Sequence, residues 1–414
     1  MLFALLAMAL AAPAPLRLAD VLREAREKNP DLKAAQARIA SASSSVDPAG
    51  ALDDPMLMVQ LWNAPLDFSN VPVMVQLSQA LPLGGKRAAR RDAATAEADA
   101  AKANAVVQLH DVEVMVAQAY FDLFLAERTQ EVDDGLDRLL QALLQASEAR
   151  VSTGKGEQVE LLRAQGAVIQ LRSDRETAND RRSSSWARLA ALLDRDPMAP
   201  PSSTTRPGLL TGLPPEVTLR DRALRERPEL AGAHAMIQGA EAQARLAHAA
   251  GVPDVAPFVA LMHTFNGTGE TNFLFAGVQG NLPIFGGSKN APRIAGASAQ
   301  VQALRDAEHA VRNRIGAEVT ESYAHVLAET HQIELHHQLI PLSRQTVESA
   351  EHSYAAGRTG FTMVLDSVRD LRMHELDLAQ HLAMYEQRLA ELQRAVGGDI
   401  GADQAAEAGH ADDH

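Results

Sequence analysis

Histidines near the end of the chain are the residues whose chemistry most readily suggests cation binding. His331, His336 and His337 are spaced in a way that matches one helical face poorly, and His374 and His381 lie a heptad apart. This spacing predicts no specific metal site. The final segment, GHADDH, is more typical of a disordered acidic tail that binds metal weakly at most.

The chain offers little else on which enzymatic chemistry could rest. It contains no cysteine, which excludes disulfides, thiolate metal sites and thiol catalysis. It has no phosphate-binding loop, no His-Glu-x-x-His sequence and no nucleophile elbow, and its GTGETN segment falls in a predicted hairpin loop. A net charge of −14 argues against a nucleic-acid partner. The sequence therefore predicts a protein that is not an enzyme and needs no cofactor.

Composition and the first residues indicate helices behind a secretion signal. Hydrophobic residues make up 46% of the chain but aromatic residues only 4%, which favours helices with narrow Ala and Leu seams. Residues 1–14, MLFALLAMALAAPA, resemble the apolar core and small-residue end of a signal peptide. Since no other stretch approaches the roughly 18 apolar residues of a spanning helix, any membrane contact falls to strands.

The chain is a tandem duplication. Asn-Pro-Asp-Leu at 29–32 aligns with Arg-Pro-Glu-Leu at 227–230, and the double glycines, a Tyr-containing segment and a Gly-containing turn follow in the same order. We expect a first helix-hairpin-helix repeat at 15–197 and a second at 218–398. Between them lies a Pro-rich connector at 198–217, and an acidic tail occupies 399–414.

The spacing of apolar residues changes twice within each repeat, from helical to alternating and back to helical. Alternating apolar and polar residues predict two hairpins with four strands per chain. The expected strands lie near 55–62, 71–83, 255–265 and 272–285. After each hairpin come about 65 residues that read as helix and would span about 100 Å. Such a length implies a coiled-coil rod, and the returning helices match it in length.

The double glycines mark the points where strand becomes helix. We call Gly84, Gly85, Gly286 and Gly287 the strand-to-helix exits. A sharp redirection of the chain calls for glycine's permissive backbone, and the preceding Leu-Pro ends the strand. Because open strand edges are not tolerated in lipid, four strands require several chains to form a closed barrel.

These features resemble the TolC-type outer membrane factors over about residues 16–398. The segments DPMLMVQLWNAPLD and SQALPLGGKRAARRDAA are most similar to the CzcC/CusC-like heavy-metal branch. The resemblance implies a mainly α fold with a membrane β part. Long antiparallel coiled-coil helices would form an α-barrel, and three chains would share a twelve-stranded transmembrane β-barrel.

The resemblance also implies a function and partners. The protein would be a homotrimeric outer membrane channel of a tripartite efflux pump, extending into the periplasm and carrying heavy-metal cations. Its partners would be a periplasmic adaptor protein, an inner-membrane RND-type pump and outer membrane lipid. Two alternatives stay open: type I protein secretion or drug efflux through the same fold, and a soluble periplasmic coiled-coil scaffold. The scaffold would not explain two amphipathic hairpins at equivalent places.

Two sets of residues match functional positions of that family. The turns RVSTGKGEQVELL and YAAGRTGFTMVL match the helix tips where an adaptor docks. There Gly154 and Gly357 would reverse the chain, while Lys155, Arg358 and Thr359 would be exposed for contact. The alternative is a plain helix-helix turn.

The pore aperture is the second matching position. Asp366 falls where the family carries one of its acidic aperture residues, but Met363 occupies the other. Asp370 lies one helical turn further on and could substitute, since residues four apart share a face. Three copies of an aspartate around a narrow pore would attract cations. The alternative is a solvated aspartate on the flank of a coiled coil.

Overall fold

The fold is known from a computed structural model. It describes residues 15–62, 71–154, 156–199, 202–207, 212–266, 269–283 and 286–400. The expected signal peptide, Lys155 and the tail from residue 401 lie outside these residues. The tail was expected to begin at Asp399; the last described residue is Ile400, whose side chain is buried. Among the described residues, no helix combines the length and the apolar character needed to cross a lipid bilayer.

The chain divides into two compact units, and each takes residues from both repeats. Unit 1 comprises 1–33, 108–227 and 314–414, and unit 2 comprises 34–107 and 228–313. The long helices α4 (Lys86–Ser152) and α8 (Gly286–Ala355) pass from unit 2 into unit 1. Each repeat is therefore a unit of sequence but not a unit of packing.

Unit 2 contains the sheet. Its strands are β1 (Met56–Leu61), β2 (Val73–Ser78), β3 (Val255–Asn266) and β4 (Gly269–Gly280), antiparallel in the order β1-β2-β3-β4. The four strands were expected, but β2 and β4 end earlier than predicted. Beyond β2, Gln79 N–H still donates to the Pro257 carbonyl, and Leu81 and Val255 form an isolated bridge just before Pro82, which has no N–H to donate.

One face of this sheet is apolar and exposed. The register places Val59, Val75, Leu261 and Leu274 in one row across all four strands. Their side chains are 60%, 38%, 51% and 76% exposed, whereas the polar Gln76 beside them is only 8% exposed. The predicted alternation along the second strand is thus confirmed, with the apolar side chains facing outward.

The strand-to-helix exits differ between the repeats. Gly84 and Gly85 have φ of +71° and +76°, so the first exit uses the left-handed backbone expected of glycine. Gly286 and Gly287 instead form the first residues of α8, and the prediction that they need such a conformation is wrong. Gly286 N–H donates to the Pro283 carbonyl at 3.0 Å.

A buried lysine ties the first exit to the second repeat. Lys86 Nζ donates to Asp254 Oδ1 at 2.6 Å and to the Val252 carbonyl at 2.7 Å, and the lysine side chain is 8% exposed. Asp254 Oδ1 also accepts from the Leu83 N–H at 3.1 Å. Burial opposes ionisation of Asp254, but these bonds hold its pKa below the usual value. Lys86 therefore links the start of α4 to the segment that precedes β3.

The other helices of unit 2 accompany the two long ones. They are α3 (Val46–Gly50), α7 (Pro228–Ala249) and all but the first four residues of α2 (Pro30–Ser44). Small residues allow close packing: a Cβ at Gly239 on α7 would lie 3.4 Å from the Ala96 side chain on α4. The Ala-rich composition therefore serves narrow helix-helix seams, as the sequence predicts.

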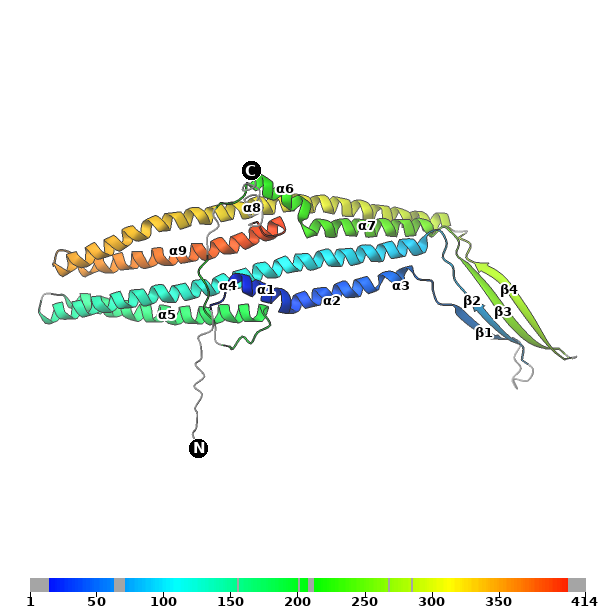
Figure 1. The fold of residues 1–414 in the computed structure, drawn as a ribbon, viewed down its shortest axis with the longest axis horizontal. Helices are drawn as coiled ribbons and strands as arrows, with labels where there is room; N and C mark the ends of the chain where they lie inside the picture. The colour runs from blue at the N-terminus through cyan, green and yellow to red at the C-terminus, as the bar shows by residue number, and fades with distance from the viewer. Residues whose placement is uncertain are drawn as a thin grey trace, which may run out of the picture. The chain divides into compact units, whose positions relative to one another are not determined.

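Unit 1 is built from helices whose buried residues repeat every seven positions. It holds α1 (Leu18–Lys28), α5 (Gln158–Leu192), α6 (Glu216–Glu226), α9 (Phe361–Val396) and the rest of α4 and α8. Figure 1 shows α5 returning beside α4 and α9 beside α8. The buried seam of α8 follows heptads from Val319 through Val326, Ile333, Ile340 and Val347 to Tyr354. This is the coiled-coil pattern expected from the sequence.

Candidate functional site at the helix tips

The turn between α8 and α9 is closed by a glycine in the left-handed conformation. Gly357 has φ of +70°, and its N–H donates to the Tyr354 carbonyl at 2.9 Å. The Arg358 N–H donates to the Ser353 carbonyl at 2.8 Å. This pair of bonds is the Schellman arrangement, which satisfies the last carbonyls of a helix while reversing the chain. The predicted reversal at Gly357 is present.

The turn between α4 and α5 is closed in a similar way. Gly154 has φ of +68°, and its N–H donates to the Val151 carbonyl at 3.0 Å. Gly156 N–H donates to the Arg150 carbonyl, also at 3.0 Å. A Cβ at Gly154 or Gly357 would meet nothing within 4 Å. Glycine is therefore required at these two positions by backbone conformation alone, since space is available.

Tyr354 joins the two tips into one cluster. The Arg150 guanidinium lies 4.7 Å from the centre of the tyrosine ring, and the Tyr354 hydroxyl donates to Glu160 Oε2 at 3.2 Å. Phe361 meets the same ring edge-on at 6.0 Å. Burial raises the pKa of the tyrosine hydroxyl. Because α4, α5, α8 and α9 all contribute, the tips of the two repeats form one rigid end.

The surface of this end differs in part from the prediction. Gly154, Gly357 and Arg358 are exposed, as expected of contact residues. Thr359 is half-buried, and its Oγ1 atom is inaccessible and has no hydrogen-bond partner, so its expected exposure is wrong. Thr362 is exposed instead, where its hydroxyl accepts a 2.8 Å bond from Arg163 of the other tip. The sequence signal missed here was the register of the first turn of α9.

The predicted aperture residues lie on one exposed face of α9, just past the tip. Asp366 and Asp370 are both exposed, as is Met363, at 57%. Arg369 Nη1 lies 3.7 Å from Asp366 Oδ1, an exposed pair that contributes little to stability. Within one chain the two aspartates face solvent. Their convergence into a ring would need other copies of the chain, so that role stays a prediction.

A buried carboxylate behind this face was not anticipated. Asp133 on α4 is fully buried and accepts a 2.8 Å bond from Arg372 Nε on α9. Arg372 Nη2 lies 3.0 Å from Asp174 on α5. Burial opposes the charge of Arg372, but the two carboxylates raise its pKa above the ordinary value. The pairing links the two repeats, and no local sequence pattern could reveal it because the partners are far apart in the chain.

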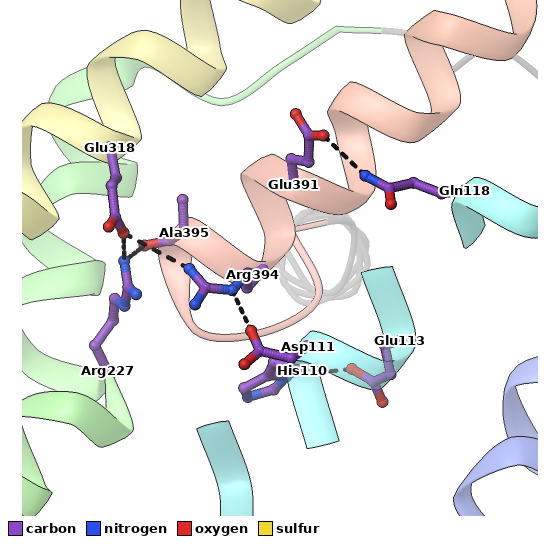
Figure 2. A network of polar contacts seen from close by, with 9 residues as sticks. All are labelled: His110, Asp111, Glu113, Gln118, Arg227, Glu318, Glu391, Arg394 and Ala395. Atoms are coloured by element: carbon purple, nitrogen blue, oxygen red, sulfur yellow. Dashed lines mark hydrogen bonds and ion pairs between the residues drawn. The ribbon is translucent and has the colours of Figure 1, made fainter. Parts of the chain in front are cut away.

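A second polar network lies at the other end of unit 1 (Figure 2). Arg227, whose side chain is 2% exposed, donates to the Glu318 carboxylate and, at 3.3 Å, to the Ala395 carbonyl. Arg394 donates to Asp111 at 2.6 Å and lies 3.7 Å from Glu318. These contacts fasten the end of α9 to α4, α8 and the junction of α6 and α7.

A cavity of about 510 Å³ adjoins the end of α9 in this network. Leu18, Arg26, Glu113 and Glu386 are among the residues that line it. Arg26 donates to Glu113 at 2.7 Å, whereas burial raises the pKa of Glu386 to about 7. Glu386 is thus a half-buried acid at the wall of this cavity.

Comparisons with known proteins agree over most of the chain. A sequence model described as "Outer membrane efflux protein" matches residues 21–195 and 219–398. The cobalt-zinc-cadmium resistance protein CzcC of Cupriavidus metallidurans is 26% identical over 395 residues, or 93% of this chain and 91% of that protein.

Solved structures show the same fold. The outer-membrane channel OprN matches with a TM-score of 0.80 and 18% identity, covering 92% of this chain and 90% of that one. A structure of CusC matches with a TM-score of 0.79 and 19% identity, covering 93% of each chain. At these identities the structural likeness concerns the architecture alone.

Proposed function

Because the chain belongs to the outer membrane efflux protein family, we propose that it forms the outer membrane duct of a tripartite pump that exports heavy-metal cations. The protein resides in the outer membrane and extends into the periplasm. Fold and family are those of channel proteins rather than enzymes. Its cargo, its partners and the role of each tip residue belong to the proposal.

The exposed apolar face of the sheet is the observation that carries the proposal. A water-soluble sheet turns its apolar side chains inward, but here Leu57, Val59, Leu274 and Val278 are 60–76% exposed while Gln76 is buried. Along β2, exposed apolar residues alternate with the buried polar residues Gln76 and Ser78, which is the pattern of a strand that meets lipid on one face. Four strands leave two open edges, so we propose that three chains pool twelve strands in one transmembrane barrel.

The helix tips are the proposed contact with the periplasmic adaptor. They combine a stiff backbone, held by the glycine turns and Tyr354, with the exposed side chain of Arg358. Asp366 and Asp370 would face the pore just behind the tips and form an acidic ring of three chains. An inner-membrane RND-type pump would deliver the cargo through the adaptor.

The heavy-metal cargo is supported by the relative of matching length. That protein's printed name connects it with cobalt, zinc and cadmium resistance, and a −14 net charge is compatible with a cationic cargo. Protein secretion or drug efflux through the same architecture is the competing proposal. The soluble scaffold is disfavoured by the outward apolar face.

A resistance assay separates these proposals. A strain lacking the chain should become sensitive to Co²⁺, Zn²⁺ and Cd²⁺, and the wild-type chain should restore growth. Gly357→Val should fail to restore it although trimers still reach the membrane, since a β-branched residue strains the φ of +70°. A strain with unchanged metal resistance but a missing secreted protein would favour the secretion duct. Full resistance from Gly357→Val would contradict the tip assignment.

A further inference from the structure

Three potential metal ligands that are distant in sequence meet between α8 and α9. His336 on α8 and His374 and Asp377 on α9 offer ligand atoms that all lie within 4.8 Å of one another. The rings of His336 and His374 are 5.5 Å apart between centres. The spacing of residues along one helix could not reveal this cluster, because its members come from both helices.

The two imidazoles have buried nitrogen atoms with nothing to bind. Nδ1 of His336 and Nδ1 of His374 are inaccessible and lack a hydrogen-bond partner, and His336 is only 6% exposed. Leaving a buried polar atom unpaired costs on the order of 1–3 kcal/mol. Native proteins seldom retain two such atoms side by side without a ligand, water or ion to satisfy them.

Imidazole nitrogens are among the commonest ligands of transition-metal ions, and a third histidine lies against His336. Nearby, His381 stacks on His336 at 5.5 Å and its Nδ1 is held by Glu329 at 2.7 Å.

The duplication supplies an independent argument. Asp133 and Asp174 precede His336 and Asp377 by 203 positions each, the offset that also relates Gly154 to Gly357. In the first repeat, these two carboxylates grip the cationic Arg372. In the second repeat, the charged and titratable groups that act on His336 are Asp377, His381 and His374.

We propose that His336, His374 and Asp377 bind a divalent transition-metal ion of the Zn²⁺ or Co²⁺ class. Two imidazoles and one carboxylate form a donor set that such ions accept, with a fourth position left for water or a further ligand. Ligand atoms around tetrahedral zinc are about 3.3 Å apart, so side-chain rotation must bring them closer by up to about 1.5 Å. Arg372 links neighbouring helices by pairing with Asp133 and Asp174 of the first repeat. The bound ion would link neighbouring helices at the equivalent positions of the second repeat.

This site does not depend on the cargo of the duct. His336 is buried between two helices of one chain, so we assign it a role in fastening α8 to α9 rather than in transport. The site could be occupied in a channel that exports drugs or proteins. Its failure and the failure of the proposed function are therefore separate results.

Cobalt spectroscopy on the full-length detergent-solubilised protein tests the site. After removal of metal with EDTA, titration with Co²⁺ should give one tight equivalent per chain with the visible bands of a four-coordinate nitrogen-oxygen site. His336→Leu and Asp377→Asn should each weaken this binding at least tenfold. In the wild type alone, Zn²⁺ should also raise the thermal unfolding midpoint.

Two controls separate the site from background binding by other histidines. His337→Gln changes the exposed neighbour of His336 and should leave binding unchanged. Replacing His410 and His414 with glutamine removes the imidazoles of the final segment and should leave the tight equivalent intact. The proposal is overturned if the wild type shows no four-coordinate spectrum. Asp377→Asn keeps the buried imidazole, so unchanged cobalt affinity in that variant would overturn it even if His336→Leu fails to fold.

Discussion

The two repeats end their long helices alike but begin them differently. At the ends of α4 and α8, Gly154 and Gly357 adopt nearly the same left-handed backbone, at φ of +68° and +70°. At the beginnings, Gly84 is left-handed while Gly286 lies within the helix. A repeated sequence motif therefore predicts a repeated conformation only where the surrounding hydrogen bonds are repeated too.

A similar divergence occurs where the two short helices of each repeat meet. In the first repeat Asn29, 1% exposed, caps α2 by accepting from the N–H groups of Asp31 and Leu32 at 2.9 and 3.2 Å. In the second repeat the equivalent residue is Arg227, a buried cation paired with Glu318. The same junction is held by a neutral cap in one copy and by an ion pair in the other.

The largest expected difference in stability between the two repeats follows from the ion pair of Arg227 with Glu318. Arg227→Ala removes the buried cation and deprives Glu318 of its main partner, which should cost about 3–5 kcal/mol of unfolding free energy. Asn29→Ala removes a helix cap and should cost about 1–2 kcal/mol. Thermal unfolding midpoints of the two purified variants give the comparison. Equal losses in both would mean that the ion pair contributes no more than the cap.

The two repeats are also expected to differ in how pH affects stability, because of Glu386 in the second half of α9. Glu386 is half-buried and its pKa is raised to about 7, whereas Ser183, which precedes it by the repeat offset of 203, is exposed. Between pH 4.5 and 7 the folded chain keeps a proton that the unfolded chain has released. Stability should therefore fall as pH rises through this window, by at most about 3 kcal/mol.

Glu386→Gln should abolish this loss because the amide does not titrate. The variant should match the wild type in unfolding midpoint at pH 5 and exceed it at pH 8. Midpoints measured across this range are sufficient, with Ser183→Ala as the matched control in the other repeat. A wild-type chain whose midpoint is the same at both pH values would rule out the raised pKa as a source of instability.

The smallest expected effect on stability comes from replacing a glycine at each strand-to-helix exit with alanine, and its sign differs between the two repeats. A Cβ at Gly84 would lie 2.9 Å from Val252 Cγ2 on a backbone with φ of +71°, so Gly84→Ala should cost about 1–2 kcal/mol. Gly287→Ala meets nothing within 4 Å inside a helix and should stabilise by about 0.5 kcal/mol. Unfolding midpoints of the two alanine variants check the signs. Destabilisation by both would mean that the second exit also needs glycine's freedom.

Periodicity predicted the parts of the fold that depend on local burial. The heptad seam of α8, the alternation around Gln76 and the turn at Gly357 were all accessible from residue spacing. Spacing failed where contacts join distant segments. Three contacts depend on packing between elements that the sequence does not place relative to one another. They are the ion pair of Asp133 with Arg372, the burial of Lys86 beside Asp254, and the contact of His336 with His374.

Local chemistry also misassigned some residues at the tips. Thr359 was expected to be exposed because it matches the family's adaptor-docking turn, but its hydroxyl oxygen is inaccessible in the structure. Asp366 and Asp370 were correctly expected to share one face, since four positions make about one helical turn. Whether that face lines a pore depends on neighbouring chains, which one chain's sequence cannot position.

Single-channel conductance in planar bilayers tests the central claim most directly. Purified trimers should insert and give discrete conductance steps, which hexamminecobalt added at the helix-tip side should block through the ring of Asp366 carboxylates. Asp366→Ala should weaken that block at least tenfold while leaving the number of insertions unchanged, and Asp370→Ala should weaken it less. A protein that stays monomeric and gives no conductance would contradict the duct. Unchanged block in both variants and in the double variant would place the aperture elsewhere.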